Sequence, residues 1–103
     1  MNSTLDRSFL ALSHPVRRAI IERLTDGPAT VGEATQGLGI SKPAVTKHLK
    51  LLEEAGAVAR TVEGRTHRLR LMPEPLDDAS QWIDRHRALW ERKFAAIDRY
   101  LTE

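Results

Sequence analysis

The 103-residue sequence contains no cysteine, few aromatic residues and no long apolar run. Without cysteine there is no disulfide, no thiolate metal site and no cysteine nucleophile, so a metal site would need histidine and carboxylate ligands. No apolar stretch approaches the length of a membrane-spanning helix, and Asp6 and Arg7 interrupt the region where a signal peptide has its hydrophobic segment. We therefore expect a cytoplasmic protein with no membrane partner.

A large excess of one charge is also missing, because 16 Lys and Arg residues face 14 Asp and Glu residues, for a net charge of +2. The placement of the charges carries more information than their total. Basic side chains concentrate in the segment 42–70, whereas acidic residues outnumber basic ones from residue 71 onward. A chain of this length fits one domain, so we predict a single domain over residues 1–103 with two functional regions.

Two short helices are predicted at the start of the chain. Apolar residues recur at helical spacing within residues 1–12 and again from Pro15, which is a favoured first residue of a helix. His14 precedes this proline and is expected to help cap the second helix. The Asp-Gly-Pro run at 26–28 ends that helix.

A helix-turn-helix is predicted over residues 30–55. Thr30 and Glu33 have the spacing of a capping box, in which each side chain accepts a hydrogen bond from a free amide at a helix start. A turn with two glycines follows, and Ser41 then caps a longer helix over residues 41–55. A short helix, a glycine turn and a capped helix in this order are typical of the motif.

A β-hairpin and a long helix complete the predicted fold. Alternating and β-branched residues over 58–71 indicate a hairpin, or wing, with its tip at Glu63 and Gly64. Two prolines separate the hairpin from a last helix over residues 76–102 that has no internal glycine or proline. The predicted fold is mainly α with a small β-hairpin (α+β): a winged helix-turn-helix with a long C-terminal helix.

The two sides of helix 41–55 differ in chemistry. One side carries Val45, His48, Leu49, Leu52 and Ala55, and we expect it to pack in the core, with His48 as a structural histidine. Small and basic residues gather on the opposite side, where ammonium groups can reach guanine acceptors or phosphates. The predicted DNA-binding residues of this helix are Ser41, Lys42, Pro43, Thr46, Lys47 and Lys50. An ordinary solvated helix face is the alternative interpretation.

The wing carries further basic residues. Arg65 lies next to the predicted tip, where a wing meets backbone phosphate or the minor groove, and it is the strongest candidate there. Arg60 and Arg68 are also candidates for DNA contact. For these two, solvated charge that protects a sheet edge is an equally good interpretation. His67, beside the wing, is a further candidate for contact with a phosphate, and a residue without contact to DNA is the alternative.

Three further segments are LSHPVR at 12–17, SKPAVTKHL at 41–49 and LEEAG at 52–56. In their sequence, order and spacing these segments resemble the ArsR family of bacterial winged-helix repressors. The resemblance implies a homodimer in which the first and last helices, 1–12 and 76–102, form the interface. It also implies a sequence-specific regulator that represses transcription by presenting two recognition helices to a palindromic operator in double-stranded DNA.

Apolar residues along one side of the last helix indicate a dimer independently of the resemblance. A helix of this length overhangs so small a domain unless a second surface covers it. Packing within one chain is the alternative. The predicted interface residues are Leu5, Phe9, Leu76, Ala79, Ile83, His86, Trp90, Phe94, Ile97 and Leu101.

A sensor site of the family's known kinds is not expected. The third helix has no cysteine, and Asp84 and His86 match only the first half of the last-helix metal motif, because Ile97 and Tyr100 occupy the other ligand positions. We therefore predict no metal and no cofactor, and His86 as a hydrogen-bonded interface histidine. No nucleophile, paired carboxylate or phosphate loop indicates an enzyme. Two alternatives stay open: a winged-helix protein-interaction module, and a repressor whose metal or small-molecule effector binds at the dimer interface.

Overall fold

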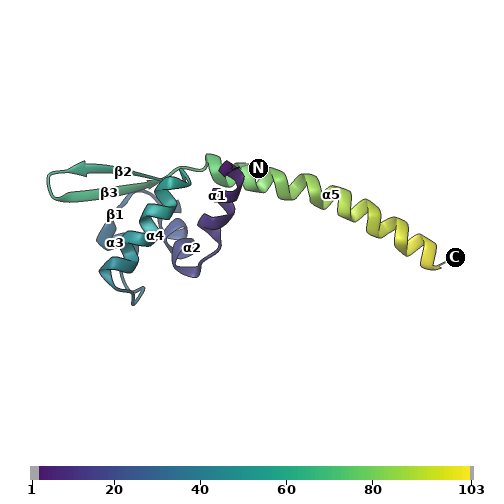
Figure 1. Cartoon of the computed structure of the whole chain (residues 1–103), viewed down its shortest axis with the longest axis horizontal. Coiled ribbons are helices and arrows are strands. Elements are labelled where there is room, and N and C mark those ends of the chain that lie inside the picture. The colour runs from purple at the N-terminus through teal and green to yellow at the C-terminus, as the bar shows by residue number, and fades with distance from the viewer. Residues whose placement is uncertain (1–2, 103) are drawn as a thin grey trace.

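The computed structural model describes residues 3–102, so residues 1 and 2 of the predicted first helix and residue 103 lie outside the described part. Figure 1 shows the shorter helices gathered beside a small sheet, with the last helix projecting away from them. In chain order the elements are α1 (Ser3–Leu12), α2 (Pro15–Thr25), β1 (Ala29–Thr30), α3 (Val31–Thr35), α4 (Lys42–Glu54), β2 (Val58–Glu63), β3 (Thr66–Leu71) and α5 (Glu74–Thr102). The predicted winged helix-turn-helix with a long C-terminal helix is confirmed.

The helix caps form as the sequence predicts. At the start of α2, His14 Nδ1 accepts the N–H of Val16 at 3.1 Å. The capping box at the start of α3 has both of its hydrogen bonds, at 3.0 and 3.2 Å. At the start of α4, Ser41 Oγ accepts the N–H of Ala44 at 3.3 Å. These bonds satisfy amides that the first turn of a helix leaves free, and they set where α2, α3 and α4 begin.

The wing is an antiparallel hairpin whose turn lies one residue later than predicted. Glu63 pairs with Thr66 as the last rung of the ladder, so the turn is Gly64 and Arg65 rather than Glu63 and Gly64. Gly64 has a φ of +61°, which glycine adopts freely and which suits the first central position of a two-residue hairpin turn. Arg65 therefore occupies the turn itself.

A short third strand was not predicted. β1 pairs antiparallel with β3, with Ala29 opposite Leu69 and Thr30 opposite Arg68, so the sheet order is β1-β3-β2. A strand of two residues is too short to show an alternating pattern in the sequence. Its pairing nevertheless attaches the start of α3 to the base of the wing.

The core lies between α1, α2, α4 and the base of the wing. The predicted packing side of α4 is confirmed, because Leu49, Leu52 and Ala55 are buried and Val45 and His48 are half-buried. Burial of this side directs the opposite side of the helix to solvent. The buried cluster comprises Ala11, Ile20, Ile21, Leu24, Ala34, Leu49, Leu52, Ala55, Ala57, Val58 and Leu69.

A buried arginine connects three helices at the edge of this core. Arg17 of α2 is 5% exposed, and its Nε and Nη2 both donate to the carbonyl oxygen of Leu10 in α1, at 3.2 and 2.8 Å. Its Nη2 also donates to Ser13 Oγ at 3.0 Å, and its Nη1 lies 3.0 Å from Nδ1 of His48 in α4. His48 is thus a packed structural histidine, as predicted. Burial, and then the positive charges of His14 and Arg17, lower its pKa.

Helix α5 extends far beyond the rest of the domain, so that the chain as a whole measures 68 × 26 × 25 Å (Figure 1). Its first turns pack on the domain, where Pro75 and Ala79 are buried. The rings of Trp82 and Phe9 make a T-shaped contact there, with their centroids 5.9 Å apart. Every residue from 87 to 102 is exposed. In residues 3–102, no helix is long and apolar enough to cross a membrane.

Candidate nucleic-acid interface

The outward side of α4 carries the small and basic residues that the sequence assigned to it. All six predicted residues from Ser41 to Lys50 are exposed. Lys50 Nζ lies 4.0 Å from the Glu54 carboxylate, but the two side chains are 75% and 52% exposed, and such a pair contributes little. The ammonium groups of this side are therefore available to an anionic partner.

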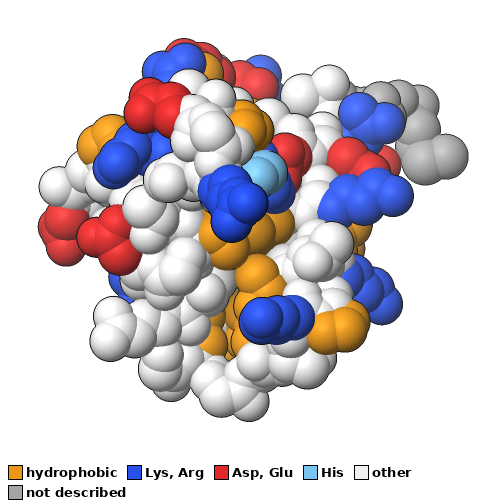
Figure 2. Space-filling model, turned by 90° about the vertical axis from the view of Figure 1, so that its left-hand side faces the viewer, with side chains coloured by type: hydrophobic (Ala, Val, Ile, Leu, Met, Phe, Trp, Pro, Cys, Tyr) orange, Lys and Arg blue, Asp and Glu red, His pale blue; other side chains and the backbone are white. Residues whose placement is uncertain are grey.

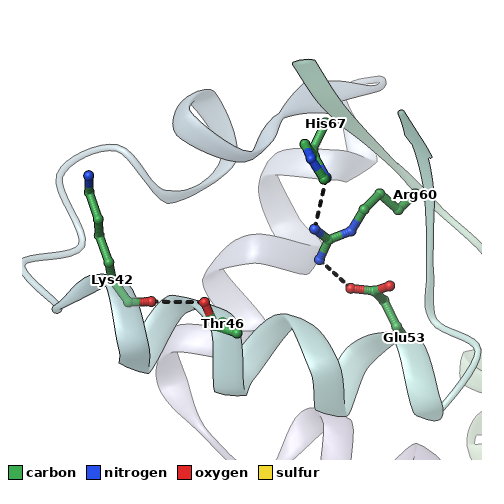
Figure 3. Close-up of polar contacts among 5 residues, drawn as sticks. All are labelled: Lys42, Thr46, Glu53, Arg60 and His67. Carbon is green, nitrogen blue, oxygen red and sulfur yellow. Dashed lines mark hydrogen bonds and ion pairs between the residues drawn. The ribbon is translucent and has the colours of Figure 1, made fainter. Parts of the chain in front are cut away.

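Thr46 has an orientation that the sequence does not reveal. Its hydroxyl donates to the carbonyl oxygen of Lys42, one turn earlier, at 3.1 Å (Figure 3). With that hydrogen used inside the helix, the hydroxyl can only accept a further hydrogen bond, and the methyl group is the side chain's remaining contact surface.

Arg60 connects the wing to α4. Its guanidinium forms an ion pair with Glu53 near the end of α4, and its Nη1 lies 3.1 Å from His67 Nδ1 on β3 (Figure 3). The sequence analysis missed Glu53 as the partner, because the contact depends on how the chain turns between α4 and β2. These bonds hold the wing beside the recognition helix. Contact of Arg60 with DNA stays a prediction.

A basic hollow of about 510 Å³ lies between the start of α3 and the wing. Arg65, from the turn of the hairpin, is exposed at its edge. Positive side chains around an open hollow favour a phosphate group of a nucleic acid backbone. The lining residues are Thr30, Val31, Gly32, Arg60, Arg65, Thr66 and His67.

Arg68 lies on the strand that pairs with β1, opposite Thr30. It is exposed, and its charge contributes to lowering the pKa of Glu33. Larger causes of that lowered pKa are the hydrogen bonds that Glu33 makes with the backbone and then the side chain of Thr30. The structure therefore places Arg68 beside the start of α3, and its contact with DNA stays a prediction.

Figure 2 shows the end of the molecule that carries the wing and α3. Lys and Arg side chains are spread over this face around a central hollow where apolar side chains are visible. Many acidic side chains lie toward the left and top of the view, and others lie beside the histidine and among the basic side chains at the upper right. Basic side chains around an apolar centre are suited to a DNA groove, where phosphates surround the exposed edges of the bases.

The predicted partial metal motif on α5 has its histidine engaged within the helix. His86 Nδ1 lies 2.8 Å from the carbonyl oxygen of Trp82, and the two rings stack at 4.0 Å. Over the described residues, no three His, Cys, Asp or Glu side chains lie together as a metal site would require. The hydrogen-bonded histidine is as predicted, and its place in a dimer interface stays a prediction.

A capped helix-turn-helix with a basic outward side, joined to a basic hairpin, defines a winged helix-turn-helix protein of the DNA-binding class. A family model described as a helix-turn-helix domain matches residues 12–61. The chain is 40% identical over 87 residues to the HTH-type transcriptional regulator Rv2034 of Mycobacterium tuberculosis, covering 84% of this chain and 78% of that protein. It is 30% identical to the transcriptional repressor SdpR of Bacillus subtilis, covering 77% of this chain and 88% of that protein.

Solved structures agree with these relatives. A crystal structure of an ArsR family transcriptional regulator, RHA00566, superimposes with a TM-score of 0.80 at 34% identity, covering 85% of this chain and 97% of that one. The chain belongs to the ArsR family of helix-turn-helix transcriptional regulators.

Proposed function

We propose that this protein is a homodimeric repressor that binds a palindromic operator through α4 and the wing. The observation that carries the proposal is the continuous exposed surface formed by the basic side of α4, the start of α3 and the basic hollow beside Arg65. Its small residues let the helix approach base edges, and its cations neutralise phosphates. The relative SdpR is a transcriptional repressor, which favours repression as the output.

The distal part of α5 supports the homodimer. Among its exposed residues, Trp90 is 45%, Phe94 is 64% and Leu101 is 74% exposed, and with Ile97 they recur at spacings of four, three and four residues. This is the spacing of a seam between two helices. A second copy of the chain would cover it and would place two α4 helices about one turn of DNA apart.

One of the predicted interface residues is buried within one chain, and others are partly buried. Ala79 is 2% exposed, and Leu76 packs against the core. Phe9 is half-buried against Trp82. The proposed interface therefore begins near Ile83 and continues toward the end of α5, with part of α1 beside it.

A gel-shift titration with the DNA upstream of the protein's own gene tests the proposal. We expect sequence-specific binding that weakens as salt increases, because the contacts release counterions from phosphates. Lys47→Ala and Lys50→Ala should weaken binding and leave thermal stability unchanged, since both side chains are exposed. Leu49→Ala is the matched control. Leu49 is 2% exposed, and its loss should lower the unfolding free energy by about 2–5 kcal/mol.

The absence of both specific and salt-sensitive binding would overturn the proposal and favour a protein-interaction module. Sedimentation with and without DNA separates these two functions. A repressor sediments as a dimer and shifts with operator DNA, whereas an interaction module sediments unchanged by DNA. A regulator of bacterial operators acts where the chromosome lies, so we propose a cytoplasmic location and no enzymatic role.

A further inference from the structure

A second hollow, of about 340 Å³, lies between α3 and α4 on the same surface. Its walls are mainly apolar, with Val31 on one side and Val45 on the other. Exposed Lys42 and Thr46 stand at its rim, one turn apart on the same side of α4 (Figure 3). The lining residues are Val31, Gly32, Thr35, Lys42, Val45 and Thr46. An apolar hollow beside a basic rim favours an occupant that has both an apolar group and a polar group able to interact with an ammonium.

Lys42 supplies the side-chain hydrogen-bond donor that the rim has free for that occupant. The Thr46 hydroxyl hydrogen is already donated to the Lys42 carbonyl oxygen at 3.1 Å, so this side chain adds a methyl group to the apolar wall. The Lys42 ammonium is an exposed donor with no acceptor capacity. The hollow therefore suits a group that presents a small apolar surface next to a hydrogen-bond acceptor.

Among the four bases, only thymine presents that combination in the major groove, with its C5-methyl group beside the O4 acceptor. Guanine presents acceptors without a methyl group, and cytosine presents a donor. We infer that each operator half-site contains a thymine whose methyl group enters the hollow between α3 and α4 while Lys42 donates to the adjacent acceptor. This inference rests on the proposed function and adds the base that the surface selects.

Gly32, one of the lining residues, provides a substitution that adds a methyl group at the wall of the hollow without a steric clash. A Cβ atom built at this position meets only Thr30 Oγ1, at 4.0 Å, and Gly32 is not among the glycines with positive φ. Gly32→Ala is therefore compatible with the backbone of α3 and removes a glycine from a helix. Thr46→Ser is the complementary change, because it deletes a methyl group from the rim and keeps the hydroxyl.

The test replaces the thymines of an operator, recovered by selection from a random DNA pool, one at a time with deoxyuridine. This change removes only the methyl group. We expect one position in each half-site at which binding weakens by about fourfold, the order of magnitude for burial of one such group. In the Gly32→Ala and Thr46→Ser variants, the ratio of the affinities for operators with thymine and with deoxyuridine at that position should approach one. Thr46→Val keeps a methyl group, so this variant should still bind the thymine operator more tightly than the deoxyuridine operator.

The outcomes separate the inference from the proposed function. Intact operator binding with no position sensitive to deoxyuridine would overturn the thymine contact and leave the repressor proposal standing. A sensitive position that responds equally in Gly32→Ala, Thr46→Ser and the unaltered protein would also overturn it, because the methyl group then lies elsewhere. Failure of the unaltered protein to select any DNA would instead contradict the proposed function. Thermal unfolding of each variant confirms that the fold is retained.

Discussion

Replacing Arg17 with methionine should destabilise the protein, because the buried Arg17 side chain bonds to groups of α1, of the turn after it and of α4. Methionine fills a similar length without the guanidinium, so the change removes hydrogen bonds and keeps most of the packing. The side chain bonds to Leu10 O, Ser13 Oγ and His48 Nδ1 at 2.8 to 3.2 Å. The substitution therefore removes the hydrogen bonds that connect α4 to the end of α1 and to the turn between α1 and α2.

The size of the effect follows from which partners are left unsatisfied. The Leu10 carbonyl still accepts from the backbone N–H and the hydroxyl of Ser13, at 3.2 and 2.7 Å. His48 Nδ1 loses Arg17 Nη1, its only hydrogen-bond partner among the described residues. Leaving one partly buried polar atom unpaired costs about 1–3 kcal/mol, and relief of the buried charge offsets part of any further loss. We expect the unfolding free energy to fall by about 2 kcal/mol.

Urea denaturation at one fixed protein concentration measures this change, and concentration must be fixed because dimerisation contributes to apparent stability. The double variant Arg17→Met with His48→Leu removes both polar partners. It should be more stable than the sum of the two single changes by about 1–2 kcal/mol, since no polar atom is then left without its partner. This account of the buried arginine would be refuted if the two single substitutions had additive effects on the unfolding free energy. A decrease of less than about 0.5 kcal/mol for Arg17→Met would also refute it.

Three further changes test other parts of the structure. Burial and nearby cations lower the pKa of His48 from 6.5, so the unfolding free energy should fall as pH drops below that value, and His48→Gln should flatten this dependence in urea titrations. Thr30→Ala breaks the capping box and should cost about 1 kcal/mol by thermal unfolding, whereas a loss near zero would contradict its role as a cap. Phe94→Glu should convert the proposed dimer to monomer in sedimentation. Phe94 is 64% exposed within one chain and lies in the proposed seam, so a charge there would be buried without a partner in the dimer. Arg92→Ala, on the opposite side of α5, should leave the dimer intact.

The features predicted correctly from the sequence are those decided over a few neighbouring residues. The capping box of Thr30 and Glu33 and the cap at Ser41 each involve residues three apart, so their spacing alone identifies them. The packing side of α4 follows from helical periodicity in the same way, because Leu49 and Leu52 are also three residues apart.

The features that were missed depend on how separate elements meet. The ion pair of Glu53 with Arg60 joins a helix to a strand across a turn, and neither residue has a neighbour that reveals the other. The hollow between α3 and α4 depends on the angle between those helices, and the turn at Gly64 depends on how far the hairpin ladder extends. Sequence spacing carries none of these quantities.

In the proposed dimer, the exposed end of α5 would make operator binding depend on the concentration of the protein. Residues 87–102 are all exposed in one chain, and a helical segment of this length is only marginally stable alone in water. In a dimer held by this segment, pairing buries apolar side chains and so keeps the segment helical. Monomer and dimer would then differ in the helical content of this segment as well as in the number of chains. Occupancy of a palindromic operator then follows the square of the monomer concentration at low levels. A modest change in synthesis would thereby produce a steeper change in transcription, even without an effector.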